Sequence, residues 1–272
     1  MLADNMVSLS VLASGSRGNC SVVASSRTRI LVDAGVSCRE IGRRMQAGGE
    51  HPSSLSAIVI SHEHSDHVTG LYVLARKLKI PVFMTEATYH AWQRWAREKN
   101  DGVKPELEKL ERFDSGRSFT IGDVTISPFT IPHDAVDPVG FTFRVDGVKI
   151  GFATDLGYMP ASVADNLRGC DMLLIESNHD VEMLRGGPYP WVVKQRVMSR
   201  VGHLSNEALA QWFAGDYDGS AAFLVLAHLS EQNNHPDLAR RAAEQALAPR
   251  QDLWRNRLLL ATQDRPLEPI RL

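Results

Sequence analysis

The sequence predicts one compact α/β domain over residues 1–272, and two observations support this fold class. Short apolar runs, such as AIVIS (57–61) and AAFLVLAH (221–228), alternate with segments of helical periodicity along the whole length. Histidine or aspartate directly follows several of these runs, at the strand ends where open α/β sheets collect their ligands. No low-complexity tract and no Pro- or Ser-rich linker divides the chain.

Strands and helices alternate through the first half of the chain. Apolar and β-branched runs predict strands at residues 7–13, 21–25, 29–35, 57–61 and 81–84. The first two are separated by the turn-forming SGSRGN, where glycine permits positive φ. Apolar residues at helical spacing predict helices at residues 38–46, from Asp66 to Leu78, and at 86–98. The charged stretch 99–112 is expected to be an exposed connection.

The second half begins with strands and continues with alternating helices and strands. Strands are predicted at residues 118–121, 124–131, 139–145, 149–155, 171–177, 221–228 and 257–263. The VDG turn at 145–147 joins two of these strands. Helices are expected around residues 160–167, 190–200, 205–214 and 236–248, and Pro236 opens the last of them.

Composition and charge exclude several classes of protein. The 272 residues are 43% hydrophobic and 23% charged, and the formal net charge of -2 gives no overall positive field that would attract nucleic acid or anionic lipid. Cys20, Cys38 and Cys170 are odd in number and form no CxxC pair, which favours reduced thiols in a cytoplasm. The sequence has no secretion-signal pattern and no run of roughly 18 apolar residues. We therefore expect a cytoplasmic protein with no membrane partner.

Four ligand-type residues lie within the short stretch SHEHSDH (61–67), directly after a predicted strand. Alternate side chains of an extended backbone share a face, so His62 and His64 are expected to point at one place beyond the strand. Asp66 and His67 fall at the turn into a helix, where a carboxylate caps exposed N–H groups. A solvated polar loop is the alternative, but it predicts no further donors at strand ends.

Further donors do follow other predicted strands. They are Asp33 after RILV, His133 after VTISPFTIP, Asp155 after KIGFAT and His228 after AAFLVLA. For any one of them, a helix cap or a hydrogen-bonded histidine at a sheet edge is at least as common as metal binding. Their recurrence at strand ends favours a shared metal centre.

The order and spacing of these donors resemble the metallo-β-lactamase-fold hydrolases across nearly the whole chain. The HxHxDH motif of residues 62–67 carries the resemblance, together with the downstream histidines and aspartate. Several further blocks resemble the YycJ branch, also called WalJ or VicX, whose members are thought to act as nucleases: LASGSRGNCSVV, LVDAGVS, IPHDAVDPVGF, TDLGY, LIESNHD, GHLSNEA and LAHLSEQNN. The resemblance implies a four-layer αββα sandwich with the site along one edge.

The resemblance also implies a role for each donor. One metal ion would be bound by His62, His64 and His133, the second by Asp66, His67 and His228, with Asp155 bridging the two. Asp33 would accept an imidazole N–H from outside the ligand set and so orient that ligand. Imidazole and carboxylate ligands without thiolate admit zinc, manganese and iron, with zinc preferred and manganese next.

A two-metal centre predicts hydrolytic chemistry. Two cations that share a water lower its pKa from about 15.7 toward roughly 7, and Asp66 could accept a hydrogen bond from the bridging hydroxide. His203 resembles the additional histidine that tRNA 3′-processing relatives place near the scissile phosphate, and Glu176 would orient it as their acidic partner does. His203 is thus a candidate general acid or phosphate ligand. The alternative is a histidine that only marks the start of a helix.

Two residues are candidates for contact with the substrate. Asn19 in the glycine loop and His179 in SNHD are candidates at the mouth of the site, but a left-handed turn residue and a loop residue at the rim are the respective alternatives. His235 is expected to cap a helix, while His51 and His90 are expected on the surface. Basic residues that could contact nucleic acid are Arg17, Lys194, Arg196, Arg200, Arg240 and Arg241, and none of them is singled out.

The predicted activity is that of a metal-dependent phosphodiesterase or nuclease, such as a 5′-to-3′ exonuclease on DNA or RNA. Thioester or lactone hydrolysis on the same fold is one alternative, since the fold alone does not select the substrate. A regulatory protein that binds metal without catalysis is another. Diiron reductases of this fold are disfavoured, because they place Glu where His64 stands and carry an added flavin domain.

Overall fold

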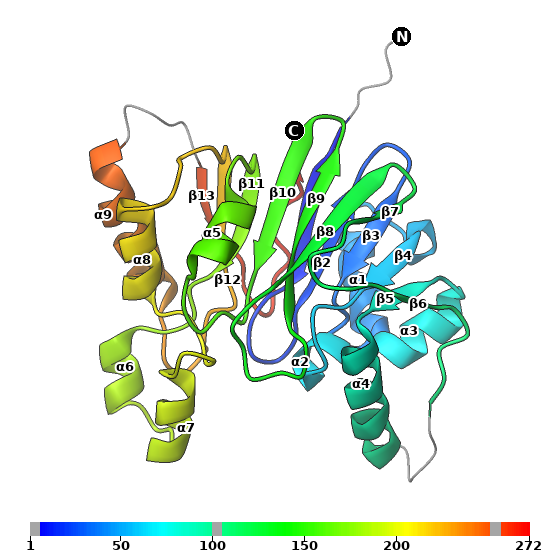
Figure 1. Ribbon diagram of the computed structural model, residues 1–272, viewed down its shortest axis with the longest axis horizontal. Coiled ribbons are helices and arrows are strands. Elements are labelled where there is room, and N and C mark those ends of the chain that lie inside the picture. Colours follow the sequence, from blue (N-terminus) through cyan, green and yellow to red (C-terminus); the bar gives the residue numbers. More distant parts are fainter. Residues whose placement is uncertain (1–5, 100–104, 251–256) are drawn as a thin grey trace.

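Two β-sheets pack against each other, and helices cover the outer face of each sheet (Figure 1). The computed structural model describes residues 6–99, 105–250 and 257–272. Within those ranges each sheet has seven strands. The arrangement is the predicted four-layer αββα sandwich.

The first sheet contains the N-terminal strands and one strand from the end of the chain. Its order is β14-β1-β2-β3-β4-β5-β6. The strands are β1 (Ser8–Ala13), β2 (Cys20–Ala24), β3 (Arg29–Val32), β4 (Ala57–Val59), β5 (Val82–Met84), β6 (Leu110–Arg112) and β14 (Ile270–Arg271). Strands β3 to β6 are parallel, so their carboxyl ends share one edge. The helices on its outer face are α1 (Cys38–Ala47), α3 (Leu71–Leu78) and α4 (Glu86–Lys99).

The second sheet has the order β13-β12-β11-β10-β9-β8-β7. Its strands are β7 (Phe119–Ile121), β8 (Val124–Thr130), β9 (Val139–Val145), β10 (Val148–Ala153), β11 (Met172–Glu176), β12 (Phe223–Ala227) and β13 (Arg257–Leu260). Strands β7 to β10 form an antiparallel meander, and β10 to β13 are parallel. The covering helices are α5 (Ala161–Leu167), α8 (Asn206–Ala214) and α9 (Pro236–Leu247). Two further helices, α6 (Val181–Gly186) and α7 (Trp191–Val197), lie beyond the sheet ends.

Three apolar clusters match this layering. The central cluster joins both sheets, with Leu9 and Val59 from the first and Phe141 and Phe143 from the second. A second cluster lies under α5, α8 and α9, and a third under α1, α3 and α4. Because sheet strands bury alternate residues on opposite faces, each sheet contributes to the central cluster and to one outer cluster.

Most predicted elements are present, and the differences have local causes. Strand β6 lies in the stretch 99–112 expected to be a connection; it is a short edge strand with exposed Glu111 and Arg112, so it lacks an apolar signal. Residues 100–104 of that stretch lie outside the described residues. The two-residue β14 and the six-residue α6 were not predicted.

The helix expected from Asp66 to Leu78 is two helices, α2 (Ser65–Val68) and α3. The break falls at Gly70, where an added Cβ would lie 2.1 Å from the carbonyl oxygen of Val36. The backbone of Gly70 therefore packs closely on the turn after β3, at the point where α2 ends and α3 begins. Within the described ranges, no helix is both long and apolar enough to cross a membrane.

Candidate metal centre

The predicted donors meet at one edge of the sandwich, where strands from both sheets end. Asp33 follows β3, and the HxHxDH motif of residues 62–67 follows β4 in the parallel part of the first sheet. His133 follows β8, Asp155 follows β10 and His228 follows β12 in the second sheet. Strands β8, β10 and β12 run in the same direction, because β8 and β10 each pair antiparallel with β9 and β12 is parallel to β11 and β10. The sheet topology thus places all of these side chains at one edge.

Three donors have a left-handed backbone. Asp33 has φ of 59°, Asp155 of 58° and His228 of 54°. Non-glycine residues adopt this region rarely, with Asp, Asn and His enriched among them. Each residue directly or closely follows a strand, so the reversal ends the strand and directs the side chain into the site.

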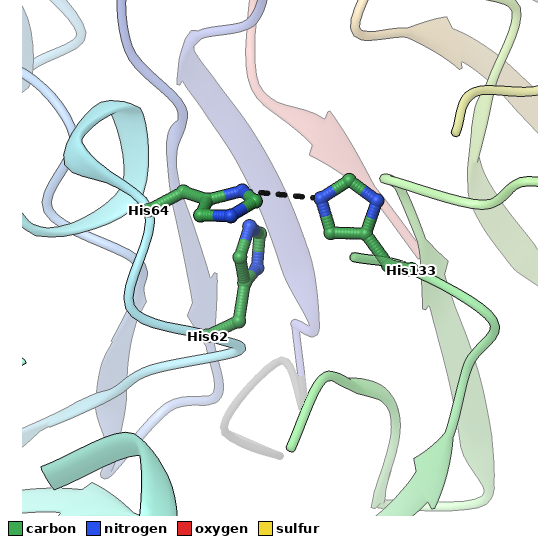
Figure 2. Close-up of side chains that lie close together, drawn as sticks. All are labelled: His62, His64 and His133. Carbon is green, nitrogen blue, oxygen red and sulfur yellow. Dashed lines mark hydrogen bonds between the residues drawn. The ribbon is translucent and has the colours of Figure 1, made fainter. Parts of the chain in front are cut away.

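His62, His64 and His133 form the first group of candidate ligands (Figure 2). One nitrogen from each ring lies within 4.8 Å of the others. His64 Nδ1 and His133 Nε2 are 3.1 Å apart, close to the spacing of about 3.4 Å expected for two imidazoles on one tetrahedral zinc ion. His62 Nε2 is buried and has no hydrogen-bond partner, so it is free to coordinate an ion.

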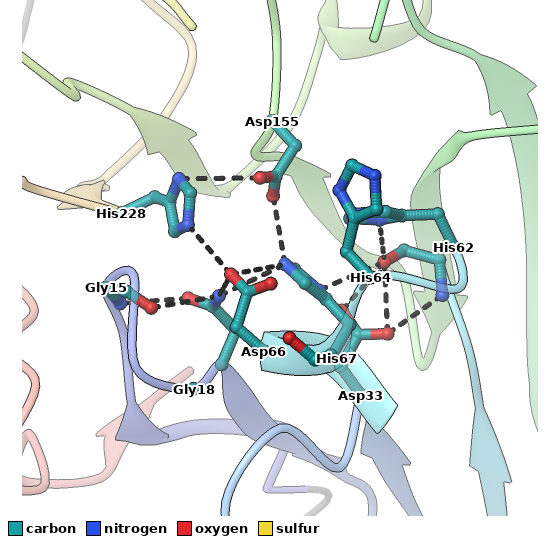
Figure 3. A network of polar contacts seen from close by, with 12 residues as sticks. Gly15, Gly18, Asp33, His62, His64, Asp66, His67, Asp155 and His228 are labelled. Atoms are coloured by element: carbon teal, nitrogen blue, oxygen red, sulfur yellow. Dashed lines mark hydrogen bonds and ion pairs between the residues drawn. The ribbon is translucent and has the colours of Figure 1, made fainter. Parts of the chain in front are cut away.

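Asp66, His67, Asp155 and His228 form the second group (Figure 3). His67 Nε2 lies 3.3 Å from Asp155 Oδ2 and 3.5 Å from Asp66 Oδ2, and His228 Nε2 lies 3.5 Å from Asp66 Oδ2. Asp155 Oδ2 and His228 Nε2 are buried without a hydrogen-bond partner. Buried polar atoms of this kind are costly unless a ligand pairs with them. The second group therefore also fits a metal ion.

The titration properties of the cluster suit a cation. Burial lowers the pKa of His62 well below its ordinary value, which keeps the imidazole neutral, the form that binds metal. Burial opposes protonation of His67 and His228 too, but Asp155, with further carboxylates, raises the pKa of both well above the ordinary value. Without metal, protons on these rings balance the buried negative charge. A divalent cation would take over that balance.

The backbone of Asp66 packs so closely on the backbone of Asn19 and Gly35 that position 35 has no room for a side chain. Asp66 O accepts a hydrogen bond of 2.7 Å from Asn19 N, and Gly35 N donates to Asn19 O at 2.9 Å. A Cβ at Gly35 would lie 1.7 Å from Asp66 O. Asp66 was expected to cap α2, and this is wrong: the N-cap is His64, without a side-chain cap bond, and Asp66 lies in the first turn.

Asp33 contacts the metal cluster from outside it. Its carboxylate accepts hydrogen bonds from His67 Nδ1 at 2.8 Å and from Ser61 N at 2.8 Å, and Ser61 Oγ also donates to it. Only 5% of Asp33 is exposed. With its Nδ1 held in this way, His67 directs Nε2 toward Asp66 and Asp155.

Glu176 holds two histidines with one oxygen atom. Its Oε1 accepts from His203 Nδ1 at 2.8 Å and from His228 Nδ1 at 2.7 Å, while Oε2 accepts from the backbone amides of Leu156 and Leu204 at 2.6 and 3.1 Å. Burial opposes ionisation, but the two histidines lower the pKa of Glu176 to about 2. The contact with His203 was expected, whereas the contact with His228 was missed. The contact with His228 could have been inferred from the sequence, because Glu176 ends the strand that lies between the two strands followed by Asp155 and His228.

Asn19 lies beside Asp66 in the second ligand group, whereas His179 is a buried residue. Asn19 closes the glycine loop by accepting from Gly15 N at 2.9 Å, and its Nδ2 lies 3.3 Å from Asp66 Oδ2. The left-handed conformation considered for Asn19 is wrong, because the positive φ values of this loop belong to Gly15 and Gly18. His179 is buried with Nδ1 unpartnered, and burial lowers its pKa to about 4.

Three of the remaining histidines lie outside the cluster, and the fourth, His203, groups with Asp155, Glu176 and His228. His235 is the N-cap of α9 and accepts from Asp237 N, as expected. His51 and His90 are exposed, as expected. His203 is 19% exposed, and its Nδ1 lies 3.9 Å from Asp155 Oδ1, so it sits at the border of the second group.

Comparisons with known proteins agree with this geometry. The model of the family described as "Beta-lactamase superfamily domain" matches residues 28–228. The chain is 39% identical over 238 residues to "Exodeoxyribonuclease YycJ" of Bacillus anthracis, covering 88% of each protein. It is 40% identical over 230 residues to "Exodeoxyribonuclease WalJ" of Streptococcus pneumoniae, covering 85% of this chain and 84% of the relative.

A solved structure shows the same fold. The metallo-beta-lactamase fold protein YhfI of Bacillus subtilis superposes with a TM-score of 0.67 at 18% identity, covering 97% of this chain and all of YhfI. The family match, the two relatives and the arrangement of strands lead to one assignment. The chain belongs to the beta-lactamase superfamily and, within it, to the YycJ/WalJ branch.

Proposed function

We propose that this chain is an exonuclease that acts on DNA with two divalent metal ions. Its superfamily and its relatives make it a metal-dependent hydrolase of the nuclease and phosphodiesterase type. The observation that carries the proposal is the convergence of seven donor side chains, which form two adjacent groups at one sheet edge. The choice of DNA is supported by the names of the two relatives, both exodeoxyribonucleases.

The proposed ligands are those that the two groups bring together. His62, His64 and His133 would hold one ion, and Asp66, His67 and His228 the other, with Asp155 between them. When bound, two such ions act as Lewis acids that ionise water near neutral pH and neutralise charge on a phosphate. Zinc is our first choice and manganese the second, since imidazole and carboxylate ligands suit both. The 5′-to-3′ direction and the cytoplasmic location belong to the same proposal.

Asp66 and His203 would act on the substrate. The Asp66 side chain is 21% exposed, more than its neighbours in the group, so its carboxylate can accept a hydrogen bond from the attacking water and orient it. His203 uses Nδ1 to donate to Glu176, which leaves Nε2 for the substrate. Burial opposes its protonation, but Glu176 raises the pKa of His203 above the ordinary value. The ring can therefore hold a proton at Nε2 and donate it to the leaving oxygen.

The proposal is tested by metal analysis and substrate assays on the purified chain. We expect close to two metal ions per chain, and release of nucleotides from end-labelled DNA that stops in a chelator and returns with zinc or manganese. DNA and RNA labelled at either end assign the polymer and the direction. His62→Ala should lose metal and at least about a hundredfold in rate. The matched control is His90→Ala, because His90 is exposed on α4.

Two results would contradict the proposal. A metal content that cannot be raised above one ion per chain without unfolding would remove the second ion. Thioester or lactone hydrolysis that exceeds phosphodiester hydrolysis by orders of magnitude would replace the substrate class.

A further inference from the structure

Exposed apolar side chains are concentrated beside the metal centre. In the described part of the chain, four of the eight exposed large apolar residues lie between positions 191 and 201: Trp191 at 62%, Val192 at 74%, Met198 at 37% and Val201 at 45% exposure. They lie on α7 and the turn after it, which Figure 1 shows beyond the sheet ends at the edge where the donors gather. Clustered apolar exposure of this kind marks a binding surface.

This surface is held in place by two basic side chains. Lys194 of α7 is buried and donates to Arg185 O at 2.7 Å. Arg196 forms an ion pair with Asp134, the residue after His133. The apolar residues therefore face outward on an anchored helix, and their exposure does not result from loose packing.

One basic side chain of this segment is open to a ligand. Residues 181–203 contain four basic residues, of which Arg185 pairs with Glu182, Arg196 pairs with Asp134 and Lys194 is buried. Arg200 lies over the ring of Tyr158, with its guanidinium carbon 4.0 Å from the ring centroid. Across the described ranges no carboxylate forms an ion pair with Arg200, so its N–H groups are available to an anion. The backbone is fixed too, since a Cβ at Gly157 would lie 2.3 Å from Arg200 O.

The surface leads directly into the metal centre. His203 N donates to Val197 O at 2.9 Å, and His133 Nδ1 lies 3.2 Å from Gly202 O. The seven residues of α7 rise about 10 Å, roughly the length of three stacked nucleotides, and Val197 at the carboxyl end of α7 is the residue bonded to His203 N. A polymer bound along α7 would enter the site beside His203.

We propose that Trp191, Val192, Met198, Arg200 and Val201, here called the α7 rim, bind the single-stranded part of the nucleic-acid substrate. Trp191 stacks on a base and Arg200 binds a phosphate, while the remaining apolar side chains cover the neighbouring base. Aromatic stacking combined with basic side chains is how proteins bind single strands without sequence preference. Trp, Met and Arg are also common in protein interfaces, so a protein partner is the alternative that the test below distinguishes. The inference rests on the proposed nuclease function for its choice of ligand.

The test measures binding apart from hydrolysis. Labelled 12-nucleotide single strands of DNA and RNA are titrated with the intact protein in EDTA, and fluorescence anisotropy gives Kd. Trp191→Ala should raise Kd roughly tenfold or more, whereas Trp191→Phe should stay within about threefold of the parent. Arg200→Gln should raise Kd and lower the slope of log Kd against log salt by about 0.7, since one phosphate contact is lost.

Two exposed residues away from the rim provide matched controls. Val73→Ala removes an apolar side chain on α3 that is 57% exposed, and Arg144→Gln removes an exposed charge on β9, near the hairpin at the opposite end from Asp155. Both should bind single strands as the parent does. Thermal unfolding of Trp191→Ala should match the parent, because the side chain is largely in solvent.

Three outcomes would overturn the proposal. One is an unchanged Kd in Trp191→Ala, and another is an equal loss of affinity for a blunt duplex, whose bases are not open to stacking. The third is an oligomer of the parent that dissociates in Trp191→Ala while Kd for single strands stays the same, which would assign the rim to a protein interface. A parent that binds single strands through the rim but hydrolyses no phosphodiester would refute the nuclease and leave the rim standing.

Discussion

Replacing Asp33 with asparagine tests how the metal centre is supported from outside its ligands. The change removes one negative charge and keeps the shape of the side chain. Asparagine also tolerates the left-handed backbone at this position, where φ is 59°, so the main chain should not move. The effect should therefore come from the lost charge and the lost acceptor.

The magnitude follows from the contacts of the carboxylate. One oxygen accepts from Ser61 N and the other from His67 Nδ1, both at 2.8 Å. If the amide oxygen keeps the bond to Ser61 N, the NH₂ group faces His67 Nδ1 and the imidazole must carry its proton on Nε2. That proton covers the lone pair directed at Asp66 and Asp155. Loss of such an outer partner lowers metal affinity about 10- to 100-fold, equivalent to about 1.4–2.7 kcal/mol.

The assay is competition for zinc between the protein and a chromophoric chelator, with urea unfolding of the metal-free protein beside it. Asp33→Asn should also lower the free energy of unfolding by about 1.5–3 kcal/mol, the contribution of one charged hydrogen bond. The matched control is Asp123→Asn, because Asp123 is likewise largely buried and accepts from Ser25 Oγ and Thr28 Oγ1 but lies far from the donors. The control should lose stability and keep its metal affinity. Equal zinc affinity in Asp33→Asn and the parent would refute the reasoning.

Three further predictions concern single groups. His203→Ala should keep both metal ions and lose at least about a hundredfold in phosphodiester turnover, and unaltered turnover would leave His203 a structural role only. Arg44→Met should lower the free energy of unfolding by about 2–4 kcal/mol, because the buried guanidinium donates to the backbone oxygens of Leu12 and Gln263 at 2.8 and 2.7 Å; calorimetry that finds no change would contradict this. Burial opposes ionisation of Asp123, but its hydrogen bonds lower its pKa. Its stabilisation is therefore complete above the unfolded-state pKa of about 3.9 and is lost at lower pH, so the stability of Asp123→Asn should fall less than that of the parent between pH 5 and 2.

The position of the site could be predicted because it depends on sheet topology. Apolar runs identify strands, and parallel strands bring their carboxyl ends to one edge, so Asp33, Asp155 and His228 could be placed together from their positions after such runs. The HxHxDH motif of residues 62–67 completed the donor set. The division into two sheets came from the family resemblance, since strand periodicity does not say which strands pair.

Other features depend on contacts that no local pattern encodes. The left-handed backbone of His228 follows from the way the chain leaves β12, and the bond from His228 to Glu176 depends on three neighbouring strands. Asn19 reaches the centre only because the glycine loop packs on Asp66. The exposure of Trp191 could not be predicted from the sequence either, because an aromatic residue on a helix usually marks the buried face of that helix.

The contact between Gly35 and the carbonyl oxygen of Asp66 has a consequence for repeated turnover. The main chain of Gly35 and Asn19 packs against the main-chain carbonyl of Asp66, so the backbone that carries this carboxylate is in place before each substrate binds. Under the proposed exonuclease function, each round of nucleotide release would start from the same backbone geometry. We expect even alanine at position 35 to disturb that constancy, since its methyl group would displace the segment that carries Asp66.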